Sequence, residues 1–348
     1  MEKYHFNIRL DNVRYKHAGS KAVEDCRQIL VNNGFTDLEI SFLKKAYLLP
    51  FNLIRLIGML FYYRIKIKPG SLLIAQYPLL GINKFIGPFL RSLRRKKCKV
   101  ACIIHDLDSI RSLDNAEQIK NEIRILSNYD AVIAHNGSMA DWLKSNGYGG
   151  KIVEIELFDY LVQKNIVPTN NFNDPDVVFA GNLARCGFLR DLKKLRDVSF
   201  GIYGPGFIPE LIKDADNVKW KGVFSPEEIV NIIEGRFGLI WDGTSIETCT
   251  GVMGEYLKYN TPHKVSLYLT CGIPVIVPQT AAIAAYIKSK NLGISVNSLT
   301  ELKDKLSLLT EPAYQEMRLN AIKFRSLLIQ GNFLSKAVGR LEQILQET

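Results

Sequence analysis

Short apolar runs alternate with helical patterns along the whole chain, and this alternation limits its folds more than any other feature. The runs expected to form strands are HFNIRL, LEISF, LLIAQYP, KVACIIHD, AVIAHN and IVEIEL in the first half, then DVVFAGNL, VSFGIYGPG, VKWKGVF, FGLIWDG, IPVIVP and GISV. Continuous apolar strands separated by helices are typical of a parallel sheet covered on both faces. The sequence therefore predicts an α/β protein with two Rossmann-like, doubly wound domains facing a cleft.

A stretch rich in Asn, Pro and Asp, residues 162–176, separates the two halves and has the composition of a linker. We therefore expect an N-terminal domain over residues 1–165 and a second domain over 166–328. Residues 329–348 form a C-terminal helix that is free to pack back on the first domain. Two helix starts, at Ser225 and at Ser298, carry a Glu three residues later and fit a capping box.

The charge balance favours anionic partners. The 348 residues carry a formal net charge of +10, which suits nucleotides, nucleic acid or a lipid surface. The six cysteines form no CxxC pair, so we expect reduced core thiols of a cytosolic protein and no zinc site. The N-terminal MEKYHFNIRL has a strand pattern and does not resemble a signal peptide.

Two stretches bear on membrane contact. Residues 46–63 approach the length of a membrane span, but Pro50, Asn52 and Arg55 interrupt them, which favours a buried or surface-lying helix. The basic YYRIKIK follows, so contact with an anionic membrane surface stays open. The densest basic run, RSLRRKKCK at 91–99, contains no aromatic residue, which disfavours a nucleic-acid platform. A solvated helix end and a lipid or polyprenyl-phosphate contact remain as its alternatives.

Small, polar and basic residues follow several strands of the second half, which indicates an anion pocket. They are Gly181, Asn182, Arg185, Tyr203, Gly204, Asn260, His263 and Lys264. His263 and Lys264 stand just after a proline at a helix start, where the helix dipole is already positive. Such charges are tolerated when an anion lies between them, and backbone N–H groups at a helix start bind phosphate well. The alternative is that the glycines only turn corners. No GxGxxG follows the first strand, and no Walker loop is present.

The block EYLKYNTPHKVSLYLTCGIPVIVP, with VVFAGNLARCGFL, YGPG and IIHDLDSIR, resembles bacterial glycosyltransferases of the GT-B fold. That group includes glucosyltransferases that extend GlcNAc on serine-rich-repeat adhesins, and β-1,6-galactofuranosyltransferases. The resemblance spans nearly the whole chain and implies that the second domain holds the nucleotide of a UDP-sugar. It makes Arg185 and Lys264 look like pyrophosphate contacts, and Tyr203 and Asn260 like nucleotide or phosphate contacts.

The first domain is then expected to hold the acceptor. HAGSK, residues 17–21, opens a helix where Gly19 and Ser20 can approach a ligand closely, unless Ser20 is an ordinary cap. IIHDLDSIR places His105 and Asp106 at the carboxyl end of a buried strand. An inverting transferase needs a base for the acceptor hydroxyl, with Asp106 the first candidate and His105 the second. The alternative is that Asp106 caps the next turn and His105 binds a backbone carbonyl.

The sequence as a whole predicts a glycosyltransferase that moves glucose, galactose or galactofuranose from a UDP-sugar to a hydroxyl of a glycan, glycolipid or glycoprotein. We expect it to be cytoplasmic, with contact at the inner face of the membrane and homo-oligomerisation both open, and with no nucleic acid as partner. A nucleotide-sugar-binding subunit without turnover is the alternative, and nucleic-acid binding is suggested by charge alone.

No cofactor or metal is expected, because a helix start with Lys264 and Arg185 can stabilise the leaving group as a divalent ion would. The DLD string at 106–108 matches the motif of metal-dependent transferases, but DPD and DAD match it as well.

Overall fold

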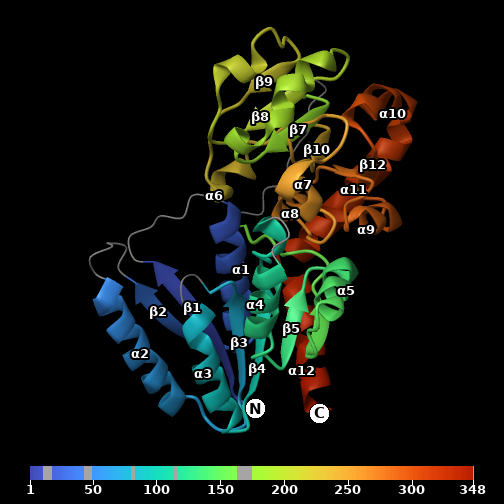
Figure 1. Cartoon of the computed structure of the whole chain (residues 1–348). Coiled ribbons are helices and arrows are strands. Elements are labelled where there is room, and N and C mark those ends of the chain that lie inside the picture. Colours follow the sequence, from blue (N-terminus) through green and yellow to red (C-terminus); the bar gives the residue numbers. More distant parts are fainter. Residues whose placement is uncertain (11–17, 43–48, 80–82, 113–115, 163–174, 348) are drawn as a thin grey trace. The chain divides into compact units, whose positions relative to one another are not determined.

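The computed structural model describes residues 1–10, 18–42, 49–79, 83–112, 116–162 and 175–347, which divide into two compact units (Figure 1). The first unit contains β1 and Ser20–Ile155, and also Phe333–Thr348 near the end of the chain. The second unit is built from Glu156–Asn332, together with residues 18 and 19. The predicted domain boundary at residues 165 and 166 lies outside the described residues and stays a prediction.

The first unit is built on a six-stranded parallel sheet with the order β2-β1-β3-β4-β5-β6. Its strands are β1 (Lys3–Leu10), β2 (Thr36–Phe42), β3 (Leu72–Tyr77), β4 (Lys99–Ile104), β5 (Ala131–Ala134) and β6 (Lys151–Glu154). Its helices are α1 (Ala18–Asn32), α2 (Leu49–Lys66), α3 (Asn83–Arg94), η2 (Ile110–Ser112), α4 (Ala116–Leu126) and α5 (Gly137–Ser145). The central strands β3 and β5 are buried at every position, as a sheet covered on both faces requires.

The second unit repeats this plan with the strand order β12-β11-β10-β7-β8-β9, again all parallel. Its strands are β7 (Val177–Ala180), β8 (Phe200–Tyr203), β9 (Val218–Trp220), β10 (Phe237–Leu239), β11 (Val275–Pro278) and β12 (Gly293–Val296). Its helices are η3 (Leu183–Arg185), η4 (Gly187–Lys194), η5 (Pro209–Ile212), α6 (Pro226–Ile229), α7 (Gly251–Tyr256), α8 (His263–Thr270), α9 (Ala284–Ser289), η6 (Leu299–Glu301), α10 (Leu302–Leu308) and α11 (Glu311–Leu328). The twelve predicted strands and the two Rossmann-like sheets are confirmed.

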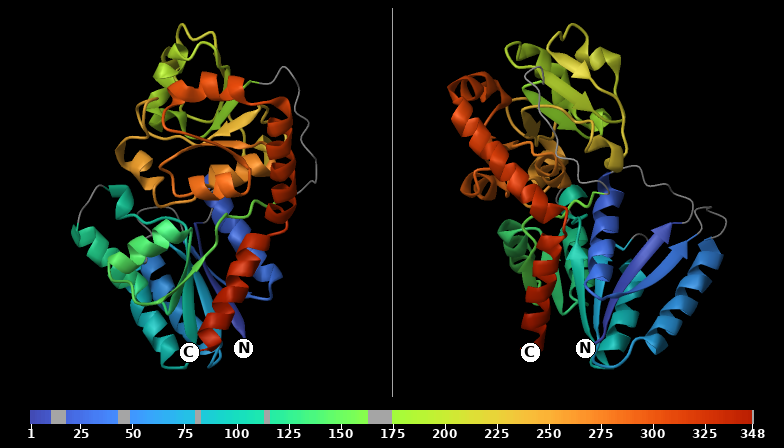
Figure 2. Two further views of the ribbon diagram at one scale, coloured as in Figure 1. Left: turned by 90° about the vertical axis from the view of Figure 1, so that its right-hand side faces the viewer. Right: turned by 180° about the vertical axis from the view of Figure 1, so that it is seen from behind.

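The last helix, α12 (Asn332–Gln346), lies beside the sheet of the first unit (Figure 2). The Glu342 carboxylate is 2.6 Å from the Lys3 ammonium on β1, and the Arg340 guanidinium donates to the Glu154 carbonyl over 2.6 Å. The two ends of the described chain therefore belong to one unit. Among the described residues, no helix has the length and apolarity needed to traverse a bilayer.

One of the two predicted capping boxes forms. The Ser225 hydroxyl accepts from the Glu228 N–H, and the Glu228 carboxylate accepts from the Ser225 N–H. At Ser298 the prediction is wrong, because residues 299–301 form a 3-10 turn. The Ser298 hydroxyl accepts from the Thr300 N–H, one residue earlier than in a capping box.

Candidate functional site

Helix α8 is fixed on the second sheet by Tyr268, which is fully buried. The Tyr268 hydroxyl accepts from the Ala180 N–H over 2.8 Å, at the carboxyl end of β7. Its ring lies against Gly238 of β10, where an added Cβ would come within 2.2 Å of the ring. Residues four apart share one face of a helix, so this anchor places Lys264 over the ends of β7 and β10.

Lys264 lies where the sequence predicts an anion site. Its ammonium is 4.3 Å from the ring centroid of Phe179 and 3.8 Å from the Asp242 carboxylate. The second distance exceeds hydrogen-bond range. A side chain at Gly181 would press on Lys264, with its Cβ 3.3 Å from the ammonium. No acceptor among the described residues is hydrogen-bonded to this ammonium, so its N–H donors are available to a ligand.

The glycine loops after β7 and β8 pack against each other with no room for side chains. At Gly204, where φ is +128°, an added Cβ would lie 1.9 Å from the Gly181 carbonyl oxygen. The Gly181 N–H in turn donates to the Tyr203 carbonyl over 3.0 Å. The Tyr203 side chain is 1% exposed, and its hydroxyl accepts from the Glu234 N–H. The Tyr203 ring is therefore buried under this loop, and the predicted ligand contact of Tyr203 stays a prediction.

The remaining predicted residues of the second unit differ in exposure. Asn182 and Arg185 are exposed at the ends of η3, and the Asn182 amide oxygen caps the turn by accepting from the Ala184 N–H. The Asn260 amide oxygen is buried and has no hydrogen-bond partner among the described residues. Arg185 and Asn260 thus both keep polar groups that a ligand could satisfy.

His263 is packed between aromatic rings at the start of α8. Its imidazole stacks on Tyr160 with centroids 5.1 Å apart, and it meets Phe158 edge-on at 6.3 Å. The Ser266 hydroxyl donates to the Phe158 carbonyl over 2.5 Å. These contacts hold the start of α8 against residues 156–162. His263 therefore helps to orient α8.

Sequence reasoning missed Asp242 and Phe179. Asp242 follows β10 as Gly181 follows β7, and the two strands are neighbours in the sheet. The strand order was the missing information, because carboxyl ends of adjacent parallel strands meet at one edge. Burial raises the pKa of the nearby Cys186 thiol to about 11 and that of Cys249 to about 12, so both thiols are neutral beside this pair.

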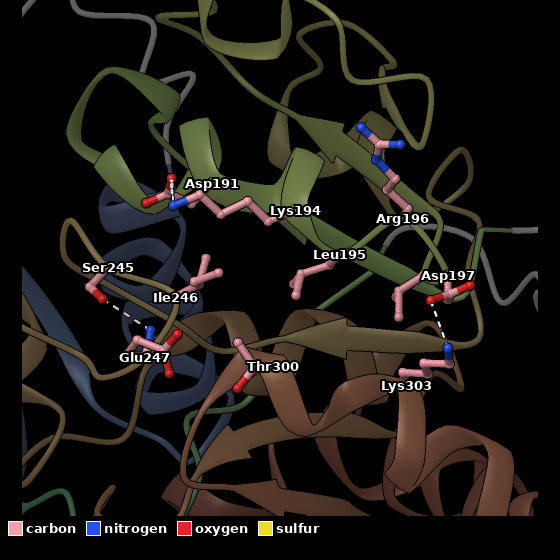
Figure 3. Close-up of a pocket in the computed structure, with 11 residues that line it drawn as sticks. Asp191, Lys194, Leu195, Arg196, Asp197, Ser245, Ile246, Glu247, Thr300 and Lys303 are labelled. Atoms are coloured by element: carbon pink, nitrogen blue, oxygen red, sulfur yellow. Dashed lines mark hydrogen bonds and ion pairs between the residues drawn. The ribbon is translucent and has the colours of Figure 1, made fainter.

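A cavity of about 410 Å³ lies elsewhere on the second unit, between η4, residues 245–247 and the η6–α10 segment (Figure 3). None of the predicted site residues lines it. Its lining carries three basic and three acidic side chains, and two ion pairs form among them: Lys194 with Asp191 at 2.7 Å, and Lys303 with Asp197 at 2.9 Å. With its charges compensated, this cavity has no evident preference for an anion.

In the first unit, a chain of hydrogen bonds ends at His105. The His5 Nδ1 lies 2.9 Å from the Asp37 carboxylate, and the Gln76 amide nitrogen lies 3.0 Å from His5 Nε2. The Gln76 amide nitrogen also donates to the Val23 carbonyl, which fixes the amide orientation. The Gln76 amide oxygen lies 2.6 Å from His105 Nε2 and can only accept a hydrogen bond. His105 Nε2 therefore carries the proton and donates it to this oxygen. His105 is held as the tautomer whose Nδ1 is basic.

Gln76 was also missed by sequence reasoning, although a polar residue in the apolar run LLIAQYP was a signal. It is 5% exposed and His5 is fully buried. Burial opposes ionisation of Asp37, but the hydrogen bond from His5 and the charge of Arg27 outweigh it and lower the Asp37 pKa. The ionised Asp37 carboxylate therefore holds the end of this hydrogen-bond series that lies farthest from His105.

Asp106 is engaged differently from His105. Its carboxylate accepts from the Arg111 guanidinium over 2.7 Å. The loop that follows is held by the buried Glu122 carboxylate, which accepts from the N–H groups of Asp108 and Ser109. Asp106 is thus engaged in an ion pair, whereas His105 is oriented by the Gln76 amide.

Gly19 and Ser20 lie in the first turn of α1, which begins at Ala18. Ser20 is the third residue of the helix, so the alternative of a Ser cap before the helix is wrong. Within the described ranges, no group of three or more His, Cys, Asp or Glu side chains could hold a metal ion.

Two family models match nearly the whole chain. The N-terminal domain of glucosyltransferase 3-like proteins matches residues 5–157, and the C-terminal domain matches residues 177–341. The β-1,6-galactofuranosyltransferase WbbI of Escherichia coli K12 is 33% identical over 284 residues, which cover 80% of each chain. Glucosyltransferase 3 of Streptococcus gordonii is 29% identical over 273 residues, 77% of this chain and 78% of the relative.

Solved structures share the fold at low identity. Sucrose-phosphate synthase from Thermosynechococcus elongatus superposes with a TM-score of 0.64 at 14% identity, covering 99% of this chain and 100% of that one. HepE from Anabaena, in complex with UDP, also gives 0.64, at 12% identity and the same coverage. The likeness supports two Rossmann-like α/β units of the GT-B type.

The first prediction concerns the His105 tautomer. In protein labelled with ¹⁵N-histidine, the ring nitrogen shifts of His105 should show the proton on Nε2. Gln76→Leu removes the acceptor and should move the population toward the Nδ1–H form. His135, whose Nε2 lies 3.0 Å from the Ile104 carbonyl, gives the reference shifts of an imidazole protonated on Nε2. An Nδ1–H tautomer of His105 in the unaltered protein would contradict the assignment.

Proposed function

The chain belongs to the glucosyltransferase 3-like family of glycosyltransferases, and we propose that it transfers a hexose from a UDP-sugar to an acceptor hydroxyl. Galactofuranose, glucose and galactose are the candidate sugars, since the relatives named above are a galactofuranosyltransferase and a glucosyltransferase. A glycan, a glycolipid or a glycoprotein would carry the accepting hydroxyl, in the cytoplasm. UDP as the nucleotide is supported by the complex of HepE, which shares the fold.

The observation that carries the proposal is the Lys264 ammonium at the start of α8. It faces the carboxyl ends of β7 and β10, the edge at which parallel α/β sheets bind ligands. The N–H groups of the first turn of α8 and the exposed Arg185 add further positive potential. Gly181 leaves room for the Lys264 side chain beside the loop after β7, and Gly204 lets the loop after β8 pack on the Gly181 carbonyl.

The proposed reaction forms a bond between the acceptor oxygen and the anomeric carbon of the sugar. The bond from that carbon to the diphosphate oxygen breaks, and UDP leaves with the electron pair. Lys264 and the first turn of α8 stabilise the charge that grows on the leaving oxygen. The hydroxyl proton goes to Nδ1 of His105, whose orientation Gln76 fixes.

The general test is release of UDP from a panel of UDP-hexoses when acceptor candidates are added. Turnover with one sugar supports the transferase. Binding of UDP-sugars without turnover on any acceptor favours a nucleotide-sugar-binding subunit. Thermal stabilisation by each UDP-sugar identifies the donor before the acceptor is known.

Lys264→Ala should weaken UDP binding by about 10- to 100-fold, because a charge-assisted contact to phosphate is lost. Calorimetric titration with UDP measures this. Lys288→Ala is the matched control, since Lys288 is an exposed lysine near the end of α9 in the same unit. Unchanged affinity in a folded Lys264→Ala protein would remove Lys264 from the donor site.

His105→Ala should lower kcat by roughly 10²- to 10⁴-fold while UDP affinity stays the same, as expected for loss of a general base. Asp106→Asn should cost less, because Asp106 is paired with Arg111. Initial rates with saturating donor, beside UDP titrations of both variants, separate the two. A larger loss in Asp106→Asn than in His105→Ala would restore Asp106 as the base.

We also propose that transfer needs no divalent ion, because protein groups supply the positive charge at the leaving diphosphate. Activity should then persist after dialysis against EDTA. Complete loss of transfer that manganese or magnesium restores would make the carboxylates of residues 106–108 the first ligands to examine.

A further inference from the structure

Helix α2 of the first unit is apolar on two opposite sides, and only one side is covered. Leu56 and Tyr63 pack inward, as does Ile67 just after the helix, and each is at most 5% exposed. The outward side carries an apolar stripe, defined as Ile54, Ile57, Phe61 and Ile65, at the spacing of one helix face. The helix lies on the outer side of the unit, next to α3 and β2 (Figure 1).

The stripe is well exposed and uninterrupted by charge. Ile54 is 70% exposed, Phe61 61% and Ile65 65%. Arg55, which breaks the apolar run in the sequence, turns away, and its guanidinium donates to the Ser41 hydroxyl on β2 over 2.7 Å. Helix α2 contains no acidic residue. Contiguous apolar surface of this kind on a folded protein marks a site of contact.

A basic cluster, defined as Arg64, Lys66, Arg95 and Lys97, adjoins the carboxyl end of the stripe. The Lys96 ammonium joins the two segments, because it donates to the Arg64 carbonyl over 2.8 Å and also to the Ile67 carbonyl. All four members of the cluster are exposed, and none forms an ion pair with an acidic side chain of the described chain. The basic run RRKK therefore lies beside the last turn of α2, which is also basic.

We propose that α2 and the basic cluster dock this protein on an anionic lipid surface. The helix would lie in the plane of the interface, with the stripe among the upper acyl chains and the cluster at the lipid phosphates. A second copy of the chain fits less well, because a symmetric contact through α2 would bring two basic clusters together without an acidic partner. This inference does not depend on the proposed sugar transfer.

The test is co-sedimentation of the full chain with vesicles of phosphatidylcholine, alone or mixed with phosphatidylglycerol. Binding is expected on the anionic vesicles and should be far weaker on the neutral ones. Phe61→Ser/Ile65→Ser should lower the partition coefficient by at least about tenfold, because two large apolar contacts are lost. Leu308→Ser/Leu319→Ser is the matched control, since both leucines are exposed on the second unit, and it should bind as the unaltered protein does.

The charge arm uses Arg64→Gln/Lys66→Gln, which should lower partition on anionic vesicles by about tenfold or more. Lys213→Gln/Lys288→Gln removes two exposed charges from the second unit and should leave it unchanged. Circular dichroism and thermal melts establish that each variant is folded.

Absence of binding to anionic vesicles would overturn the proposal, as would binding that neither α2 variant reduces below its control. Light scattering tests the alternative that a second copy of the chain, and not a lipid surface, covers the stripe. A dimer that Phe61→Ser/Ile65→Ser dissociates would make a second copy the partner and would also overturn it.

Discussion

The candidate donor site depends on one buried hydroxyl. Tyr268 accepts the Ala180 N–H at the end of β7 and lays its ring on Gly238 of β10, and so fixes helix α8 to two neighbouring strands. The opposite end of α8 is held by the buried Arg325, whose guanidinium donates to the Thr270 carbonyl. A cation at that end is favourable for the helix dipole. The helix start, where the dipole is positive, is thereby held rigidly at the sheet edge.

This anchoring explains how Lys264 can remain at a helix start. Its charge is unfavourable to the dipole there, but the Phe179 ring and the Asp242 carboxylate offset part of that cost. Neither partner accepts a hydrogen bond from the ammonium at these distances. The arrangement stabilises the Lys264 ammonium and still leaves its N–H donors for an incoming anion. Positive charge that is already in place needs no rearrangement when negative charge develops on a leaving group.

The first unit uses buried polar contacts for a similar purpose. The Asp37–His5–Gln76 chain orients His105, and the Glu122 carboxylate holds the loop just beyond it. Buried polar groups are costly unless every one of them is bonded. A network satisfied in this way permits few alternative arrangements. The imidazole at the end of β4 is consequently fixed in both position and tautomer.

Sequence alone determined the two parallel sheets, their twelve strands, the start of α8 and the resemblance to a transferase family. These follow from local information: apolar runs, Pro262 before the helix, and glycines after strands. It also predicted Lys264, His105 and Asp106 as site residues from their places at strand ends and at a helix start, and these assignments stay predictions. It could not give Tyr203 its buried place, or show that Ser298 caps a 3-10 turn.

Tertiary structure decided which of these residues meet. Asp242 and Phe179 join Lys264 because β7 and β10 are neighbours, although 56 residues, 181–236, separate the two strands in the sequence. Gln76 reaches His105 because β3 lies next to β4, and the Arg111 contact then distinguishes Asp106 from His105. The Arg55 guanidinium is held away from the outer face of α2 by its hydrogen bond to Ser41 on β2. Strand order and side-chain direction are long-range outcomes of packing, and a local pattern does not encode them.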